Sequence, residues 1–138
     1  MDSCLFCKIV KGEIPSHRVY EDDAVLAFLD IMPVNPGHTL VIPKDHHENL
    51  LDLPQETVEK VIGVIKKITP AILAGVGAEA FNLGLNNGEG AGQVVKHFHW
   101  HIMPRFEDDK YDLWHGREYN SGEAEAVLEK IKNNLIKQ

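Results

Sequence analysis

Three histidines alternate with apolar residues in the segment His97-Phe98-His99-Trp100-His101-Ile102-Met103. Period-two alternation is typical of a half-buried β-strand, because successive side chains point to opposite faces of a sheet. We therefore expect a strand over 97–103, with Phe98, Trp100 and Ile102 in a core and the three imidazoles in a row on the other face. Such a row favours a functional site over a solvated polar face. Two imidazoles can bind one Zn²⁺, or one neutral imidazole can attack phosphorus.

A glycine-rich segment, Asn86-Asn87-Gly88-Glu89-Gly90-Ala91-Gly92-Gln93, lies just before the histidines. Glycines let the main chain turn tightly and bring its N–H groups close to phosphate oxygens. Alone, such a segment would be read as a hairpin connection. Because it precedes three histidines, it favours the nucleophile over the catalytic metal.

The pattern His97-x-His99-x-His101-Ile-Met, with Gly92-Gln93 ahead of it, resembles the signature of the histidine triad family of nucleotide hydrolases and transferases. Other segments that match this family are Ile14-Pro15, Val19-Tyr20-Glu21-Asp22, Phe28-Leu29-Asp30-Ile31 and Gly37-His38-Thr39-Leu40-Val41-Ile42-Pro43-Lys44. The resemblance covers about residues 4–105, and it is to the Hint-like branch that carries a zinc site.

This resemblance implies cleavage at the α-phosphate of a purine nucleotide conjugate (of AMP or GMP), through a nucleotidyl-histidine intermediate. His99 would be the nucleophile, and His101 and His38 would support it. The residues implied around the nucleotide are Leu5, Phe6, Ile9, Phe28 and Ile31 at the base, Asp30 at the ribose, and Asn86, Gly92, Gln93, Val94, His99 and His101 at the phosphate. Many relatives carry Ser or Thr where this chain has Val94, so a possible hydroxyl donor to the phosphate is absent.

Both cysteines lie in Cys4-x-x-Cys7. In an intracellular protein this spacing indicates metal or redox chemistry more often than a structural disulfide. No βαβ unit, the usual setting of a redox pair, is visible. The resemblance implies a structural Zn²⁺ completed by His46 and His97, and such a Cys₂His₂ site leaves no position open for substrate. His47 adjoins His46 and remains an alternative ligand.

Length and composition indicate one globular domain, residues 1–138, with 43% hydrophobic and 25% charged residues. The net charge of −7 argues against a general binder of nucleic acid or anionic membranes. No apolar run approaches the ~18 residues of a membrane span. The N-terminus lacks the basic and apolar regions of a signal peptide, so we expect a cytoplasmic protein.

The elements that must position these residues can be read from apolar periodicity. A short helix over Leu5–Val10 ends near Gly12, and a long helix follows Pro54. Pro70 is expected to kink or interrupt that helix. The last helix is expected to begin after Ser121. The strands expected before the histidine strand are His17–Glu21, Ala24–Leu29, Thr39–Ile42 and Phe81–Leu85. The stripe expected to face the core in the long helix is Val58, Val61, Ile62, Ile65, Ile68 and Ile72, and in the last helix Val127, Leu128, Ile131 and Leu135.

We therefore predict an α+β domain built on a five-stranded antiparallel sheet. The resemblance further implies a homodimer whose two sheets join into one, with a tail that carries Trp114 to the partner's active site. Three other functions stay open: a dinucleoside polyphosphate hydrolase, a nucleotide-binding or scaffold module without catalysis, and a catalytic zinc enzyme. The intact His99 argues against the scaffold. Cys4 and Cys7 argue against catalytic zinc, because they offer the metal a better site.

Overall fold

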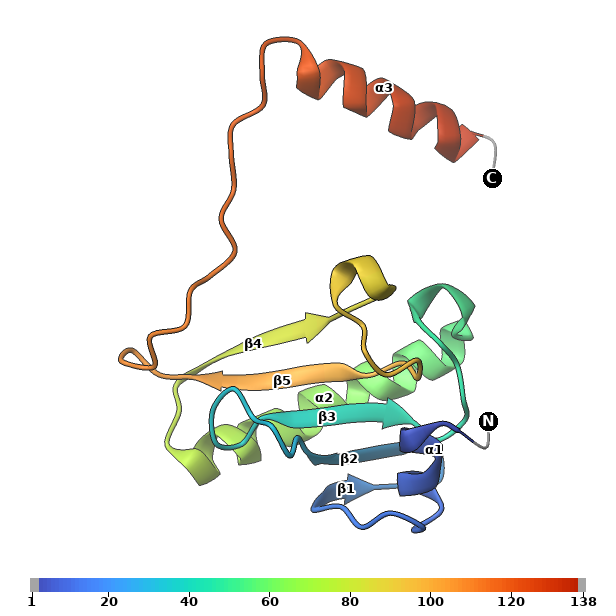
Figure 1. The fold of residues 1–138 in the computed structure, drawn as a ribbon, viewed down its shortest axis with the longest axis vertical. Helices are drawn as coiled ribbons and strands as arrows, with labels where there is room; N and C mark the ends of the chain where they lie inside the picture. Colours follow the sequence, from blue (N-terminus) through green and yellow to red (C-terminus); the bar gives the residue numbers. More distant parts are fainter. Residues whose placement is uncertain (1–2, 137–138) are drawn as a thin grey trace.

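The computed structural model describes residues 3–136. Five strands form one antiparallel sheet in the order β1-β2-β3-β5-β4 (Figure 1). The strands are β1 (Arg18–Glu21), β2 (Val25–Leu29), β3 (Thr39–Pro43), β4 (Ala80–Leu85) and β5 (Trp100–Arg105). The predicted α+β fold with a five-stranded antiparallel sheet is confirmed. β3 and β5 are central and adjacent, so the region of the histidines lies in the middle of the sheet.

Helices cover both faces of this sheet. The long helix α2 (Gln55–Val76) packs on one face and contacts β2, β3 and β5. The short helix α1 (Leu5–Val10) packs on the other face, over the ends of β2 and β3 (Figure 1). Because both faces of β2 and β3 are covered, these strands are continuously apolar. The core on the α2 side includes Val25, Ala27, Val41, Val61, Ile65, Phe98 and Ile102, and the core on the α1 side consists of Phe6, Ile9, Leu26, Phe28, Leu40 and Ile42.

Helix α2 starts after Pro54, as expected, and ends at Gly77, whose φ of 73° is left-handed. It runs through Pro70 without interruption, so the expectation that Pro70 could interrupt it was wrong, and the expected kink stays a prediction. Pro70 and Lys66 are both exposed, and water can satisfy the Lys66 carbonyl that loses its helical hydrogen bond. Ile62 is 41% exposed and does not belong to the core-facing stripe.

The histidine segment becomes regular strand only at Trp100, three residues later than expected. His97 ends a bend and His99 lies in the irregular stretch between that bend and β5, where the main-chain N–H of Phe98 donates to the carbonyl of His47 at 2.7 Å. The predicted burial of Phe98 and Ile102 is confirmed. The imidazole face was expected to be the polar side of a half-buried strand, but α1 covers it, and His97 is fully buried.

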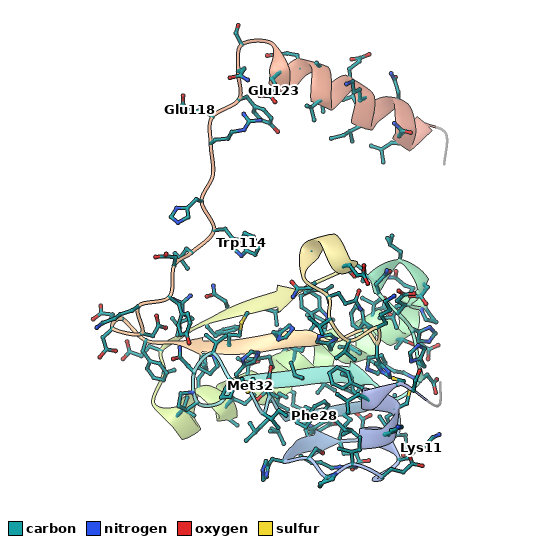
Figure 2. All side chains as sticks on the ribbon, in the orientation of Figure 1. Lys11, Phe28, Met32, Trp114, Glu118 and Glu123 are labelled. Carbon is teal, nitrogen blue, oxygen red and sulfur yellow. The ribbon has the colours of Figure 1, made fainter. Side chains whose placement is uncertain are left out.

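After β5 the chain leaves the sheet as an extended arm, residues 106–122, that carries helix α3 (Glu123–Ile136) away from the body (Figures 1 and 2). Gly122, with a φ of 79°, directly precedes α3, so the helix begins two residues after Ser121. Leu128, Ile131 and Leu135 are 50–64% exposed. The expectation that they are buried was wrong within this chain, because α3 has no core of its own to cover.

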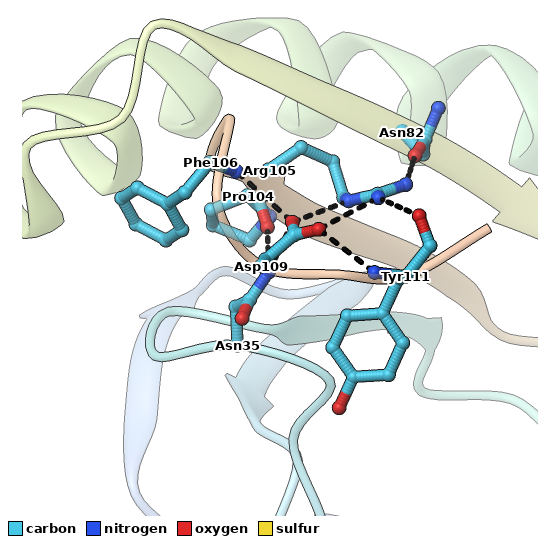
Figure 3. Close-up of polar contacts among 7 residues, drawn as sticks. All are labelled: Asn35, Asn82, Pro104, Arg105, Phe106, Asp109 and Tyr111. Carbon is cyan, nitrogen blue, oxygen red and sulfur yellow. Dashed lines mark hydrogen bonds and ion pairs between the residues drawn. The ribbon is translucent and has the colours of Figure 1, made fainter. Parts of the chain in front are cut away.

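Arg105 fixes the base of the arm (Figure 3). Its guanidinium donates to both carboxylate oxygens of Asp109, at 2.7 and 2.9 Å, to the side-chain oxygen of Asn82 at 2.7 Å and to the carbonyl of Tyr111 at 2.8 Å. Asn35 also donates to Asp109, at 2.9 Å. The arm therefore leaves the sheet from a cross-linked turn. Within residues 3–136, no helix is long and apolar enough to span a bilayer.

Candidate functional site

Strand register places His101 beside the predicted nucleoside residues. Leu40 of β3 pairs with Phe28 of β2 on one side and with His101 of β5 on the other. Directly paired residues point to the same face, so these three side chains form one row on the α1 side of the sheet. Asp30 follows the end of β2 and His38 directly precedes β3.

One hydrogen bond determines the tautomer of His99. Its Nδ1 lies 2.7 Å from the main-chain oxygen of His97, which can only accept, so the ring proton is on Nδ1. Nε2 is left with a free lone pair. His99 is 7% exposed, and burial lowers the pKa of its imidazole. A neutral imidazole with a free Nε2 can act as a nucleophile.

A second chain of hydrogen bonds determines the tautomers of His38 and His101. The main-chain N–H of Val34 donates to His38 Nδ1 at 3.0 Å, so the proton of neutral His38 is on Nε2. His38 Nε2 lies 2.9 Å from His101 Nδ1 and 3.6 Å from a carboxylate oxygen of Asp30. His101 Nδ1 therefore accepts, and its proton is on Nε2. Burial is the largest cause that lowers the pKa of His101 to about 4, and the neighbouring His99 and His38 lower it further.

Phe6 of α1 connects the predicted nucleoside pocket to the histidines. Its ring centroid lies 5.1 Å from that of His99 and 5.5 Å from that of Phe28, in edge-to-face geometry in both cases. Ile9 belongs to the same buried cluster. Leu5 is 44% exposed and Ile31 is 86% exposed, so neither belongs to the packed cluster. The assignment of these five residues to the base stays a prediction. The contact between Phe6 and His99 was not expected, because it arises only when α1 docks over the bend.

The glycine-rich loop is held by Gln93. The buried amide of this residue donates to the carbonyls of Glu48, at 2.6 Å, and Val95, at 3.2 Å, and accepts from the N–H of Gly88 at 2.8 Å. Gly92 has a φ of 92° and lies beside Asn86. Because Gln93 is fully engaged with the main chain, it supports the loop here, and its contact with phosphate stays a prediction. Val94 is 90% exposed next to the loop.

Four residues form a candidate metal centre at the other end of the histidine segment: Cys4, Cys7, His46 and His97. Their ligand atoms all lie within 4.8 Å of one another. His97 Nδ1 lies 3.4 Å from Cys4 Sγ and 3.5 Å from Cys7 Sγ. A tetrahedral zinc with ordinary Zn–S and Zn–N bonds places such atoms about 3.5 Å apart. The donor set and its spacing therefore fit Zn²⁺.

The surroundings of this centre also favour a metal. His97 Nε2 lies 2.8 Å from the carbonyl of Pro43, which leaves the Nδ1 lone pair directed at the cysteines. Burial raises the pKa of the Cys7 thiol to about 11, which makes it a poor redox thiolate without a metal. His47 is not in the four-residue set, so the structure favours His46 as the ligand.

A zinc held by the three triad imidazoles together finds no support in the described residues. His97 belongs to the cysteine set, His101 groups with Asp30 and His38, and His99 belongs to neither group of potential ligands. The three imidazoles therefore do not form one set of metal ligands, although the rings of His99 and His101 lie 4.9 Å apart.

Comparison with known proteins agrees with this geometry. The HIT domain family matches residues 11–108. An adenosine 5'-monophosphoramidase from Schizosaccharomyces pombe is 40% identical over 136 residues, which cover 96% of this chain and 98% of the yeast protein.

Solved structures are similar over nearly the whole chain. A crystal structure from Streptococcus mutans has a TM-score of 0.91 at 43% identity and covers 98% of this chain and 87% of the other. A zinc-bound histidine triad family protein from Mycobacterium smegmatis has a TM-score of 0.77 at 38% identity, with coverage of 96% and 98%. With its triad, its fold and these matches, the chain belongs to the histidine triad (HIT) family.

Proposed function

We propose that this protein is a nucleotide phosphoramidase, a hydrolase that cleaves purine nucleotide conjugates at the α-phosphate through a nucleotidyl-His99 intermediate. The observation that carries the proposal is the hydrogen bond from His99 Nδ1 to the carbonyl of His97, because it leaves His99 Nε2 free to attack. The name of the fission yeast relative, an adenosine 5'-monophosphoramidase, supports the same reaction class.

The reaction has two displacements at phosphorus. In the first, the Nε2 lone pair of His99 forms a bond to the α-phosphorus, and the bond from phosphorus to the amine breaks. His101 Nε2–H passes its proton to the departing amine and takes one back from a bound water, so the ring stays neutral and the water becomes the hydroxide that attacks next. In the second, this hydroxide attacks the nucleotidyl-imidazole, and the P–N bond to His99 breaks with release of the nucleoside monophosphate. Both histidines return to their starting protonation states.

Charge on the phosphoryl oxygens needs donors, since positioning and electrostatic stabilisation supply most of the catalysis in such transfers. His101 Nε2–H is one such donor, and the glycine-rich loop with Gly92 is the second source. The N–H groups of Ala91, Gly92 and Gln93 donate to carbonyls within the loop, so in this proposal the loop exchanges such bonds for bonds to phosphate. Asp30, next to His38, is the candidate acceptor for the ribose hydroxyls. Phe28 and Phe6 form the apolar wall on which the base rests.

Zinc at Cys4, Cys7, His46 and His97 is proposed as structural. Four protein ligands fill a tetrahedral site, so the metal would supply a cross-link and no Lewis acid for the substrate. The zinc-bound relative from Mycobacterium smegmatis supports the presence of such a metal in this family.

We also propose a homodimer. β4 is an edge strand with Phe81 42% and Leu83 37% exposed, and a groove of about 820 Å³ that includes Phe81 and Tyr111 lies between this edge and the base of the arm. Trp114 on the arm is 98% exposed (Figure 2). Pairing of two β4 edges would join the sheets and bring each arm to the other copy.

A dinucleoside polyphosphate hydrolase is the second candidate, since the same nucleophile would serve with a nucleotide as leaving group. The deciding experiment compares kcat/KM for an adenosine phosphoramidate with kcat/KM for diadenosine polyphosphates. We expect the phosphoramidate to be preferred by at least about tenfold, ~1.4 kcal/mol in transition-state stabilisation. Preference for the polyphosphates would favour the second candidate, and AMP binding without turnover of either would indicate a binding module.

A further inference from the structure

Helix α1 is too short to be stable alone. It has six residues, whereas isolated helices below ~12–15 residues are marginal in water. Its first turn has no acidic residue, and its N-terminal cap is the thiol of Cys4, which accepts from the N–H of Cys7 at 3.2 Å. What holds α1 in place must therefore come from the residues that it packs against.

The same short helix carries both metal ligands and pocket wall. Cys4 caps α1 and Cys7 lies within it, and Phe6 stands between them in the sequence. The ring of Phe6 packs edge-on against His99 at 5.1 Å and against His97 at 6.0 Å. Any movement of α1 therefore changes the metal centre and the wall beside His99 together.

His97 makes the same connection from the other side. Its Nδ1 lies 3.4 and 3.5 Å from the sulfurs of Cys4 and Cys7, and its main-chain oxygen accepts from His99 Nδ1 at 2.7 Å. Its remaining nitrogen, Nε2, is bound to the carbonyl of Pro43. One residue thus belongs to the zinc set through its ring and positions the nucleophile through its main chain.

We propose that zinc acts as a clamp that holds α1 against the histidine segment, so that metal occupancy controls nucleotide affinity and the position of His99. Phe6 and His97 are then positioning residues that act through this clamp. The inference deepens the proposed function and relies on it for the identity of the nucleotide. The core on the α2 side contains none of the four ligands, so the sheet and α2 are expected to persist without metal.

The first test removes the metal from the full-length protein. Zinc-loaded protein is stripped with a chelator, its far-ultraviolet circular dichroism is checked, and AMP binding is measured by titration calorimetry. We expect the sheet signal to persist and AMP affinity to fall about tenfold or more, ~1.4 kcal/mol. The affinity should return to its starting value when zinc is added back. The contact between Phe6 and His99, followed as a ring-to-ring nuclear Overhauser effect without nucleotide, should disappear and return with the metal.

The second test keeps the metal and changes the wall. Phe6→Leu should retain one zinc per chain and lose AMP affinity, with KM rising more than kcat falls. His47→Ala is the matched control, because His47 adjoins a ligand and lies outside the four-residue set. We expect wild-type zinc content and AMP affinity in this control.

Several results would overturn the clamp: no zinc uptake, loss of the whole fold on chelation, or a metal-free protein that keeps both AMP affinity and the contact between Phe6 and His99. Results that refute the proposed catalysis differ from those that refute the clamp. Zinc-loaded protein that bound AMP but hydrolysed no conjugate would refute the catalysis while the dependence of affinity on metal still supported the clamp. If zinc-loaded protein bound no AMP, the ring-to-ring readout would still decide the clamp, since it needs no nucleotide.

Discussion

His38 Nε2 lies 2.9 Å from His101 Nδ1, and this bond has one possible direction between neutral rings. Val34 donates its main-chain N–H to the other nitrogen of His38, so only Nε2 of His38 carries a proton. His101 Nδ1 must therefore accept the hydrogen bond from this N–H, and the proton of His101 is on Nε2. A main-chain group on the loop before β3 thereby sets the protonation of a histidine in β5.

We expect His38→Ala to impair catalysis through His101, because nothing then holds the His101 proton on Nε2. Losses of general acid–base function are typically ~10²–10⁴-fold, and we expect the loss of kcat in His38→Ala to lie in the lower part of this range. Gln at position 38 has an amide that can donate to His101, so His38→Gln should recover part of the loss. Wild-type kcat in His38→Ala would contradict this arrangement.

Stability should depend on pH through His101. Its pKa is lowered from 6.5 to about 4, so between these values the unfolded chain binds more protons than the native protein. The free energy of unfolding should therefore rise with pH from about 4 to 6.5 and lose this dependence below about pH 4. His99 and His38 face His101 and are shifted in the same direction, while Asp30 opposes the shift.

The measurement for this prediction is denaturant unfolding of wild type and His101→Ala over that pH range. His101→Ala keeps all four metal residues, so we expect both proteins to lose metal alike in acid. The difference between their slopes then reports His101 together with its effect on His99 and His38. We expect a shallower slope for His101→Ala. Equal slopes would show that His101 titrates alike in the folded and unfolded states.

Removal of a metal ligand should lower stability and zinc content together. Cys4→Ala leaves three of the four residues at the metal centre, and structural zinc in small sites contributes ~10 kcal/mol or more of apparent binding energy. We expect Cys4→Ala to contain less than one zinc per chain and to melt at a clearly lower temperature, measured by elemental analysis and calorimetry. Full zinc occupancy in this variant would exclude Cys4 as a ligand. His47→Ala, with the same analyses, serves as control.

The sequence predicted the sheet well because its signals are local. The apolar runs of β2 and β3 and the start of α2 after Pro54 follow from neighbouring residues. The start of β5 could not be predicted in this way. The bend at His97 is made by the carbonyl of His47, about fifty residues earlier, and by the ring of His99 turning back on the chain.

In the candidate site, too, some features could be predicted from the sequence and others depend on contacts between distant segments. The four metal residues come together as the family resemblance implied. The tautomers could not be read from the sequence, because they depend on the main chain of Val34, His97 and Pro43. The exposure of the apolar stripe of α3 could not be predicted from local sequence either. Its stripe has the right period for burial, but whatever covers it is not in the body of this chain.

The arm should influence the partner's active site if the protein is a homodimer. Trp114 is 98% exposed in an extended segment and has no core to enter in its own subunit. We expect Trp114→Ala to change the ratio of kcat/KM between two nucleotide conjugates by about tenfold, ~1.4 kcal/mol. Glu118→Ala, an exposed change on the same arm, is the control and should leave the ratio unchanged. Unchanged kinetics of Trp114→Ala on every conjugate would show that Trp114 does not contribute to the site. A monomer in analytical ultracentrifugation would contradict the homodimer.

Substitution of His99 gives the strongest test of the mechanism. If His99 is the nucleophile, His99→Ala removes the covalent route, and such losses can reach ~10⁶ in kcat. His101→Ala removes a proton donor, and its kcat should fall only ~10²–10⁴-fold. AMP affinity should change little in His99→Ala, because the loop, His101 and the wall formed by Phe6 and Phe28 remain.

The intermediate itself can be trapped. A denaturing quench of the wild type during turnover at alkaline pH, where the acid-labile P–N bond survives, should leave a nucleotide on the protein. Mass spectrometry of the digested chain should locate it on His99, whose Nε2 is the free nitrogen. His101→Ala should still form this adduct, since the nucleophile is intact, and should hydrolyse it more slowly than the wild type. Near-normal turnover in His99→Ala, or a label on any other residue, would show that the nucleophile lies elsewhere.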